Sequence, residues 1–195
     1  MNIFNFSKLK LPIIQAPMAG GFNTPELASA VANSGGVGSF GFSFTSPKKI
    51  DEILNTTKKL TSGFINANFF VFKPVKLPDK EVQEEALKAV ESLSLTEKYD
   101  VNIPEEPFYY DLGSQIEATL KNLPSIITFH LGIPSIHIIK KIQSFGIKVG
   151  ITATNIIEAK SIENVGADFI VAQGFEAGGH RGIFDQENID EKITL

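Results

Sequence analysis

The sequence contains no cysteine, and this absence excludes disulfide bonds and thiolate metal sites. Its three histidines, His130, His137 and His180, lie far apart and show no spacing typical of a metal site. An excess of positive charge is also absent, since 18 Lys and Arg residues are balanced by 22 Asp and Glu residues. The sequence therefore predicts neither a bound metal nor a nucleic acid or anionic membrane as partner.

Long hydrophobic runs are missing as well. No apolar run reaches the roughly 18 residues of a membrane span, and Met1 to Ser7 lack the cationic and apolar regions of a secretion signal. These absences predict a cytoplasmic protein. Of the 195 residues, 43% are hydrophobic and 21% are charged, which is the composition of one ordinary globular domain over residues 1–195.

Strand-like and helix-like segments alternate along the chain. Thr24–Pro25, Ser46–Pro47 and Asn155 are start signals for three of the helices. Glu158 follows Asn155 by three residues, as in a capping box. Six short apolar runs predict strands over residues 11–16, 37–40, 64–71, 126–129, 148–151 and 168–172.

A polar segment interrupts this alternation near residues 74–110. It is rich in glutamate and lysine and contains four prolines. Charged residues at helical spacing are typical of a solvated face, so we interpret the segment as a helix inserted at the surface of the domain.

Strict alternation predicts a parallel sheet, because each crossover helix returns the chain to run in the same direction. The sheet is then either doubly wound or a barrel. A Gly-x-Gly-x-x-Gly turn does not follow the first predicted strand, which argues against a dinucleotide-binding fold. Polar residues follow most of the predicted strands, as in barrels: Gln15, Asn68, His130, Thr152 and Gln173.

The predicted fold is thus α/β, a TIM (β/α)8-type barrel that is incomplete. A whole barrel of this type has eight strands and about 250 residues. The present chain has about six of these eight β/α units in its 195 residues.

The glycine-rich stretch of residues 171–182 follows the sixth predicted strand. Gly178 and Gly179 would let the backbone approach a flat or phosphorylated ligand. Gln173, His180 and Arg181 offer an amide, a titratable base and a fixed cation. The alternative interpretation is an ordinary tight turn with a solvated tip.

Four motifs, in order along the chain, carry a resemblance to a known family: residues 12–21, 129–134, 152–159 and 172–182. They resemble the successive motifs of the nitronate monooxygenases, formerly called 2-nitropropane dioxygenases. The resemblance implies an FMN-dependent TIM barrel that oxidises alkyl nitronates or nitroalkanes with O2. Flavin-dependent enoyl reductases and quinone reductases share the fold and part of the motifs, so a reductase with a nicotinamide donor stays open.

The resemblance also implies which residues contact the flavin. The first motif would lie against the flavin ring, two amides would form hydrogen bonds with it, and two glycines would let it approach closely. These cofactor-binding residues are Pro17, Met18, Ala19, Asn68, Gln173, Gly178 and Gly179.

Two histidines match catalytic positions of the family. His180 corresponds to the catalytic histidine, which suits removal of a proton near pH 7, and His130 to a second active-site histidine. A purely structural role is the alternative for His130, as it is for Asn68 and Gln173.

The last two β/α units of a complete barrel, which hold the FMN phosphate in the family, are not found before Leu195. We therefore expect one of two situations. The chain is a fragment, inactive alone, of a flavoenzyme whose activity belongs to a longer form. Alternatively, it is a catalytically silent paralogue that acts as a binding partner and completes its barrel with a partner chain.

Overall fold

The computed structural model describes residues 4–93, 105–185 and 190–195. The chain divides into two compact units. The first combines Met1–Phe72 with Tyr110–Leu195, and the second is Lys73–Tyr109.

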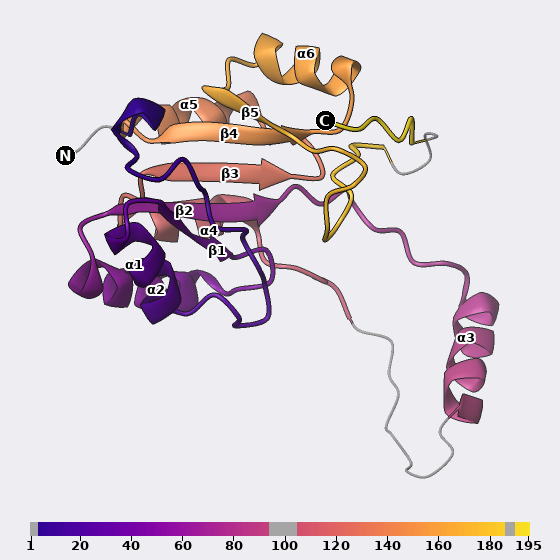
Figure 1. Cartoon of the computed structure of the whole chain (residues 1–195). Helices are drawn as coiled ribbons and strands as arrows, with labels where there is room; N and C mark the ends of the chain where they lie inside the picture. Colours follow the sequence, from indigo (N-terminus) through magenta and orange to yellow (C-terminus); the bar gives the residue numbers. More distant parts are fainter. Residues whose placement is uncertain (1–3, 94–104, 186–189) are drawn as a thin grey trace. The chain divides into compact units, whose positions relative to one another are not determined.

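A parallel sheet of five strands forms the centre of the first unit (Figure 1). Its strands are neighbours in the order in which they occur in the sequence. Doubly wound sheets reverse this order at a switch point, so the observed order is that of a barrel-type sheet. The strands are β1 (Val37–Gly41), β2 (Phe64–Phe70), β3 (Ile126–His130), β4 (Lys148–Ala153) and β5 (Phe169–Ala172).

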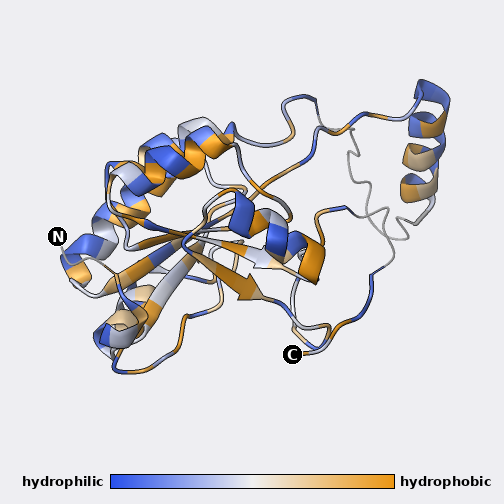
Figure 2. Ribbon diagram, turned by 90° about the horizontal axis from the view of Figure 1, so that it is seen from above, coloured by the Kyte–Doolittle hydropathy of each residue, from blue (hydrophilic) through white to orange (hydrophobic). Residues whose placement is uncertain are grey.

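Amphipathic helices surround the strands (Figure 2). Side chains cap their N-termini at the predicted positions, since Thr24 accepts from the N–H of Leu27 and Ser46 from that of Lys49. The helices of this unit are η1 (Phe6–Lys8, a 3-10 helix), α1 (Pro25–Asn33), α2 (Pro47–Leu60), α4 (Leu112–Leu120), α5 (Ile136–Ser144) and α6 (Ile156–Asn164).

The two faces of the sheet differ in chemistry because alternate residues of a strand point to opposite sides. One face packs in the main hydrophobic core together with residues of the helices, through Phe40, Ala67, Phe129 and Ile151. The other face carries buried polar side chains: Ser39, Asn66, Asn68 and Thr128. In a barrel the helices lie outside, so the polar face is the inner one.

Aromatic rings fill the inner face at the N-terminal ends of the strands. Phe4 makes edge-to-face contacts with Phe6 and with Phe64, the first residue of β2. Phe6 makes the same type of contact with Phe169, the first residue of β5. This end is therefore packed with apolar side chains, and polar groups are available at the C-terminal ends.

The prediction of a first strand over residues 11–16 is wrong. It makes only an isolated parallel bridge, between Ile14 and Val37. Pro12 has no N–H, and the N–H of Ile13 bonds to the carbonyl of Leu11 within its own segment. The described sheet thus has five strands, not six, and it is open, because β1 and β5 do not pair with each other in the described residues.

The second unit contains the helix α3 (Lys80–Leu93). The hydroxyl of Tyr109 donates to the carbonyl of Lys73, 2.7 Å away, which joins the two ends of the unit. Residues 94–104 of the predicted insertion lie outside the described residues. Across the described parts of the chain, no helix is both long and apolar enough to cross a membrane.

Candidate active site

Both predicted catalytic histidines lie at the C-terminal ends of the strands. His130 is the last residue of β3, and His180 belongs to the loop after β5, which lies beyond the ends of β2 and β3 (Figure 1). Nε2 of His130 is 3.0 Å from the carbonyl oxygen of His180. The ring of Phe70, the last residue of β2, lies 5.5 Å from each imidazole. Residues 50 positions apart are thus brought together.

His130 is half-buried, and burial lowers the pKa of its imidazole below the usual 6.5. The hydrogen bond to the His180 carbonyl opposes this shift, and the nearby His180 imidazole adds to it. A carbonyl oxygen can only accept, so Nε2 carries the hydrogen and Nδ1 of the neutral ring carries the lone pair.

This lowered pKa predicts a pH dependence of stability. The unfolded chain takes up a proton at His130 near pH 6.5, before the folded protein does, so acidification favours unfolding. We expect the contribution of His130 to be complete above about pH 6.5 and to be lost as the pH falls toward the lowered pKa.

The measurement is the free energy of unfolding by denaturant between pH 8 and 5. The His130→Gln variant should show a flatter profile in this range, whereas His137→Gln, which alters an exposed histidine of α5, should follow the wild type. Carboxylates with a lowered pKa, such as Asp190, titrate at more acid pH and do not interfere. Parallel profiles for His130→Gln and the wild type would contradict the prediction.

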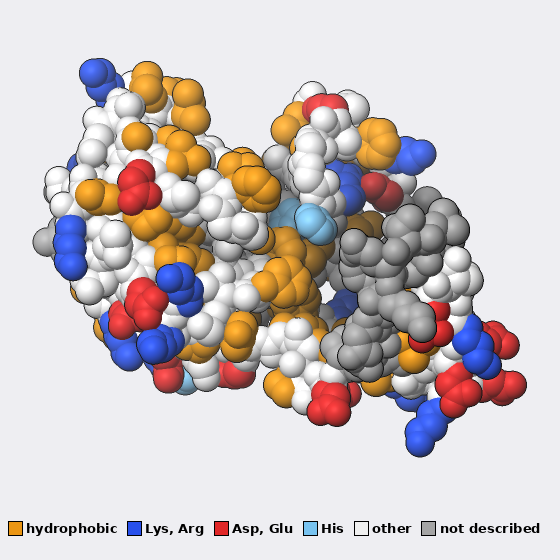
Figure 3. All heavy atoms as spheres, turned by 90° about the horizontal axis from the view of Figure 1, so that it is seen from below, with side chains coloured by type: hydrophobic (Ala, Val, Ile, Leu, Met, Phe, Trp, Pro, Cys, Tyr) orange, Lys and Arg blue, Asp and Glu red, His pale blue; other side chains and the backbone are white. Residues whose placement is uncertain are grey.

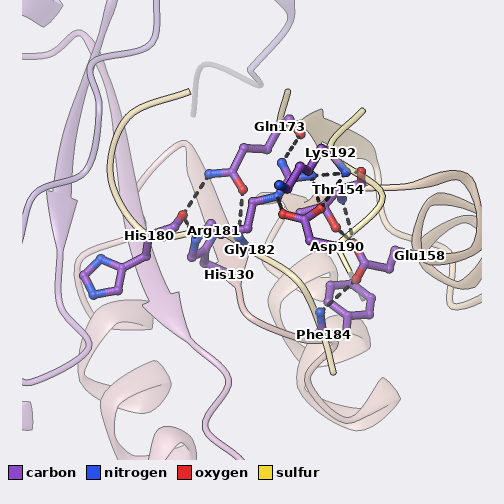
Figure 4. Close-up of polar contacts among 10 residues, drawn as sticks. All are labelled: His130, Thr154, Glu158, Gln173, His180, Arg181, Gly182, Phe184, Asp190 and Lys192. Atoms are coloured by element: carbon purple, nitrogen blue, oxygen red, sulfur yellow. Dashed lines mark hydrogen bonds and ion pairs between the residues drawn. The ribbon is translucent and has the colours of Figure 1, made fainter. Parts of the chain in front are cut away.

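Gln173 holds the loop that contains His180 (Figure 4). Its Nε2 donates to the carbonyl of His180 over 2.9 Å, and its Oε1 accepts from the N–H of Gly182 over 2.7 Å. Each end of an amide can form a second hydrogen bond, so contact with a ligand, as the sequence predicts, is compatible with this bracing role.

Arg181 is bound within the same loop. Its Nε and Nη2 donate to the two carboxylate oxygens of Asp190 over 2.8 and 2.9 Å, and Nη1 donates to the carbonyl of Gln173 over 2.7 Å. The hydrogen bonds with Asp190 raise the pKa of Arg181 and lower that of Asp190. The cation expected from the sequence therefore anchors the loop.

Glu158 anchors the far end of this loop. Its buried carboxylate accepts from the N–H and the hydroxyl of Thr154, over 2.7 and 2.8 Å, and from the N–H of Phe184 over 2.8 Å. The predicted capping box is half correct: Asn155 does accept from the N–H of Glu158. The return bond is different, because Glu158 reaches Thr154 and not the N–H of Asn155.

Gly182 allows the loop to lie directly against His130. A Cβ atom at this position would be 2.6 Å from Cε1 of His130 and 2.9 Å from Cγ2 of Thr152. Only a residue without a side chain fits there. The sequence interpretation did not single out this glycine, and its position two residues after His180 was the available signal.

Pro17, Met18 and Ala19 lie at the C-terminal end of β1. A Cβ atom on Gly41, the last residue of β1, would be 2.9 Å from the carbonyl carbon of Met18 and from the amide nitrogen of Ala19. Pro17 and Met18 are exposed. The close approach of the backbone to β1 leaves these residues at the end of the sheet where the histidines also lie.

Asn68 lies on the inner face of β2 and is buried. Its Nδ2 donates to the hydroxyl of Thr128 over 2.9 Å and to the Thr128 carbonyl over 3.3 Å. The same hydroxyl donates to Oδ1 of Asn66, so the three side chains form one buried network. Asn68 is thus fixed two residues before Phe70, whose ring contacts both imidazoles.

Gly178 and Gly179 are exposed in the loop before His180. A Cβ atom at either position would meet nothing within 4 Å, and Gly179 has a φ of +83°. Space is therefore available beside this backbone.

Within the described residues no group of His, Asp and Glu side chains could hold a metal ion.

The sequence model of the nitronate monooxygenase family matches residues 3–195. The chain belongs to this family. It is 38% identical to a nitronate monooxygenase of Paraburkholderia phytofirmans over 93% of the chain, and 34% identical to one of Pseudomonas aeruginosa over 95%. It spans 50% and 53% of these two relatives, that is, about half of their length.

Two solved structures agree with the barrel interpretation. The nitroalkane oxidase of Streptomyces ansochromogenes superimposes with a TM-score of 0.83 at 29% identity, over 97% of this chain and 54% of that one. FabK from Thermotoga maritima superimposes with a TM-score of 0.65 at 22% identity, over 89% of this chain and 44% of that chain. The second likeness shows the fold alone.

Proposed function

We propose that this nitronate monooxygenase family member takes part in the oxidation of alkyl nitronates and nitroalkanes with O2, with FMN as cofactor. The observation that carries the proposal is the pair of histidines at the C-terminal ends of the strands, joined through the His180 carbonyl. Family membership and the similarity to a nitroalkane oxidase support it.

The described residues fit a flat ring with polar edges. The exposed backbone of Pro17 and Met18 offers a surface at the end of β1, and open space lies beside Gly178 and Gly179. Each end of the Gln173 amide can form a second hydrogen bond, whereas the Nδ2 of the buried Asn68 already donates to Thr128 and leaves its Oδ1 as the acceptor for a ligand. When bound, FMN would supply an acceptor for the electron of the nitronate and a route for that electron to O2.

The chain's own residues provide the proton chemistry. His180 is exposed in its loop and in our proposal acts as the base. The α-C–H bond of the nitroalkane breaks, its proton goes to an imidazole nitrogen of His180, and the electron pair moves onto the nitro group to give the nitronate. The ring of Phe70 lies 5.5 Å from the imidazoles of both His180 and His130, so one side of the pair faces an apolar ring.

An anaerobic reduction experiment tests this function. Propyl-2-nitronate and NADH are each mixed with the FMN-loaded protein without O2, and the flavin absorbance near 450 nm is followed. If the 195-residue chain alone does not retain FMN, a form extended by the two remaining β/α units is used here and in the activity measurements below. We expect the nitronate to bleach the flavin and NADH to leave it oxidised. Rapid reduction by NADH alone would instead favour the alternative enoyl or quinone reductase, and reduction by neither reagent would contradict both activities.

A further inference from the structure

Three phenylalanines form a continuous aromatic surface beside the histidines. Phe44, in the loop after β1, lies 6.3 Å from the ring of Phe70 and 5.3 Å from that of Phe72. The rings of Phe70 and Phe72 are 5.8 Å apart. We call Phe44, Phe70 and Phe72 the aromatic wall. The wall borders the histidines at Phe70, because the ring of Phe70 contacts both imidazoles.

The outermost member of the wall is held in an exposed position. Phe44 is 60% exposed, although burial of a phenylalanine ring is strongly favourable. The buried Gln115 of α4 holds the backbone on both sides of this ring, because its Nε2 donates to the carbonyls of Phe42 and Thr45 over 3.0 and 2.8 Å.

A second bond fixes the loop to the wall itself. The hydroxyl of Ser43 accepts from the N–H of Phe70 over 2.8 Å. Ser43, before Phe44, is therefore bonded to the end of β2, and Thr45, after it, is bonded to α4. The exposed ring is preorganised, and such a ring loses little conformational freedom when a ligand packs against it.

Apolar side chains border the histidines on the molecular surface. Figure 3 shows histidine side chains with hydrophobic side chains next to them. The surface next to the imidazoles therefore has two parts of different character. The imidazoles can hold an anion, whereas phenylalanine rings have no donor or acceptor for a polar group.

We propose that the aromatic wall determines specificity, and that it selects nitronates whose carbon carries a bulky apolar substituent, above all an aryl group. This inference rests on the proposed function. The nitronate oxygens face the histidines while the substituent packs on Phe44, where offset or edge-to-face contact of rings is favourable. A polar substituent would lose water there without gaining a hydrogen bond.

The experiment compares kcat/KM for the nitronates of 2-phenylnitroethane, 1-nitrohexane and nitroethane in the wild type and in Phe44→Ala. We expect wild type to prefer the phenyl substrate over nitroethane, and Phe44→Ala to reduce this ratio about tenfold, as is common for one aromatic contact. Phe44→Leu should retain most of the preference for the hexyl chain and lose most of that for the phenyl group.

The matched control is Phe145→Ala, which removes another exposed ring, 44% accessible against 60% for Phe44, at the C-terminal end of α5, near the N-terminal end of β4. Its substrate ratios should equal those of the wild type. If all nitronates were oxidised but the kcat/KM ratios were unchanged in both Phe44 variants, the role of the aromatic wall would be wrong while the proposed function would stand. If the wild type oxidised none of the nitronates, the proposed function would fail, and the inference with it.

Discussion

Replacing His180 with alanine is expected to lower kcat/KM for neutral nitroalkanes by about 10²- to 10⁴-fold, the usual effect of removing a general base. Oxidation of nitronates formed in advance should fall much less. A nitronate has already lost its α-proton, so only the neutral substrate needs the imidazole.

The structure makes this substitution a clean one. His180 contacts His130 and Gln173 through its backbone carbonyl, which an alanine retains. The loop is also held at Arg181 and Gly182, independently of the imidazole. Loss of activity in His180→Ala can therefore be assigned to the ring, and its unfolding free energy should stay close to that of the wild type.

The measurement is kcat/KM for 2-nitropropane and for propyl-2-nitronate, each at several pH values. His137→Ala, an exposed histidine of α5 to which we assign no role, is the control and should resemble the wild type on both substrates. Equal losses on the two substrates in His180→Ala would mean that the imidazole acts on the anion or on the flavin, and the assignment as base would be wrong.

Local signals were sufficient for most of the fold. The caps at Thr24 and Asn155 and the short apolar strands depend on neighbouring residues, and the structure places them as predicted. Residues 11–16 were misjudged for a physical reason. Their apolar composition resembles that of a strand. Pro12, however, has no N–H, and the N–H of Ile13 bonds to the carbonyl of Leu11, so too few N–H groups are available for a ladder with β1.

The site was predictable in outline, because polar residues after parallel strands collect at one end of the sheet. The hydrogen-bond partners of Gln173 and Arg181 were not predictable from the sequence. Gln173 bonds to the backbone of His180 and Gly182, and a backbone group leaves no trace in residue identity. Asp190, nine residues from Arg181, is one of several acidic residues near the end of the chain, and its selection depends on the loop conformation.

Glu158→Ala is expected to lower the free energy of unfolding by about 2 to 4 kcal/mol. The substitution leaves the buried N–H of Thr154 and the part-buried N–H of Phe184 without their acceptor, at about 1 to 3 kcal/mol for a buried unsatisfied group. Because Phe184 follows His180 in the same loop, the change should also free the loop from α6. Activity on nitronates should then fall together with stability.

Two further variants distinguish the loss of the loop anchor from a general destabilisation of α6. Glu163→Ala removes an exposed carboxylate from the same helix and should change the unfolding free energy by less than about 0.5 kcal/mol. Glu158→Gln can keep its oxygen toward Thr154, but it then turns an NH₂ donor toward the N–H of Phe184. We therefore expect an intermediate loss of stability, and faster amide hydrogen exchange at Phe184 than at the N–H of Thr154. If exchange at Phe184 stayed as slow as in the wild type in both Glu158 variants, the carboxylate would not be the anchor of the His180 loop, and the backbone contacts of Gln173 and Arg181 alone would have to hold it.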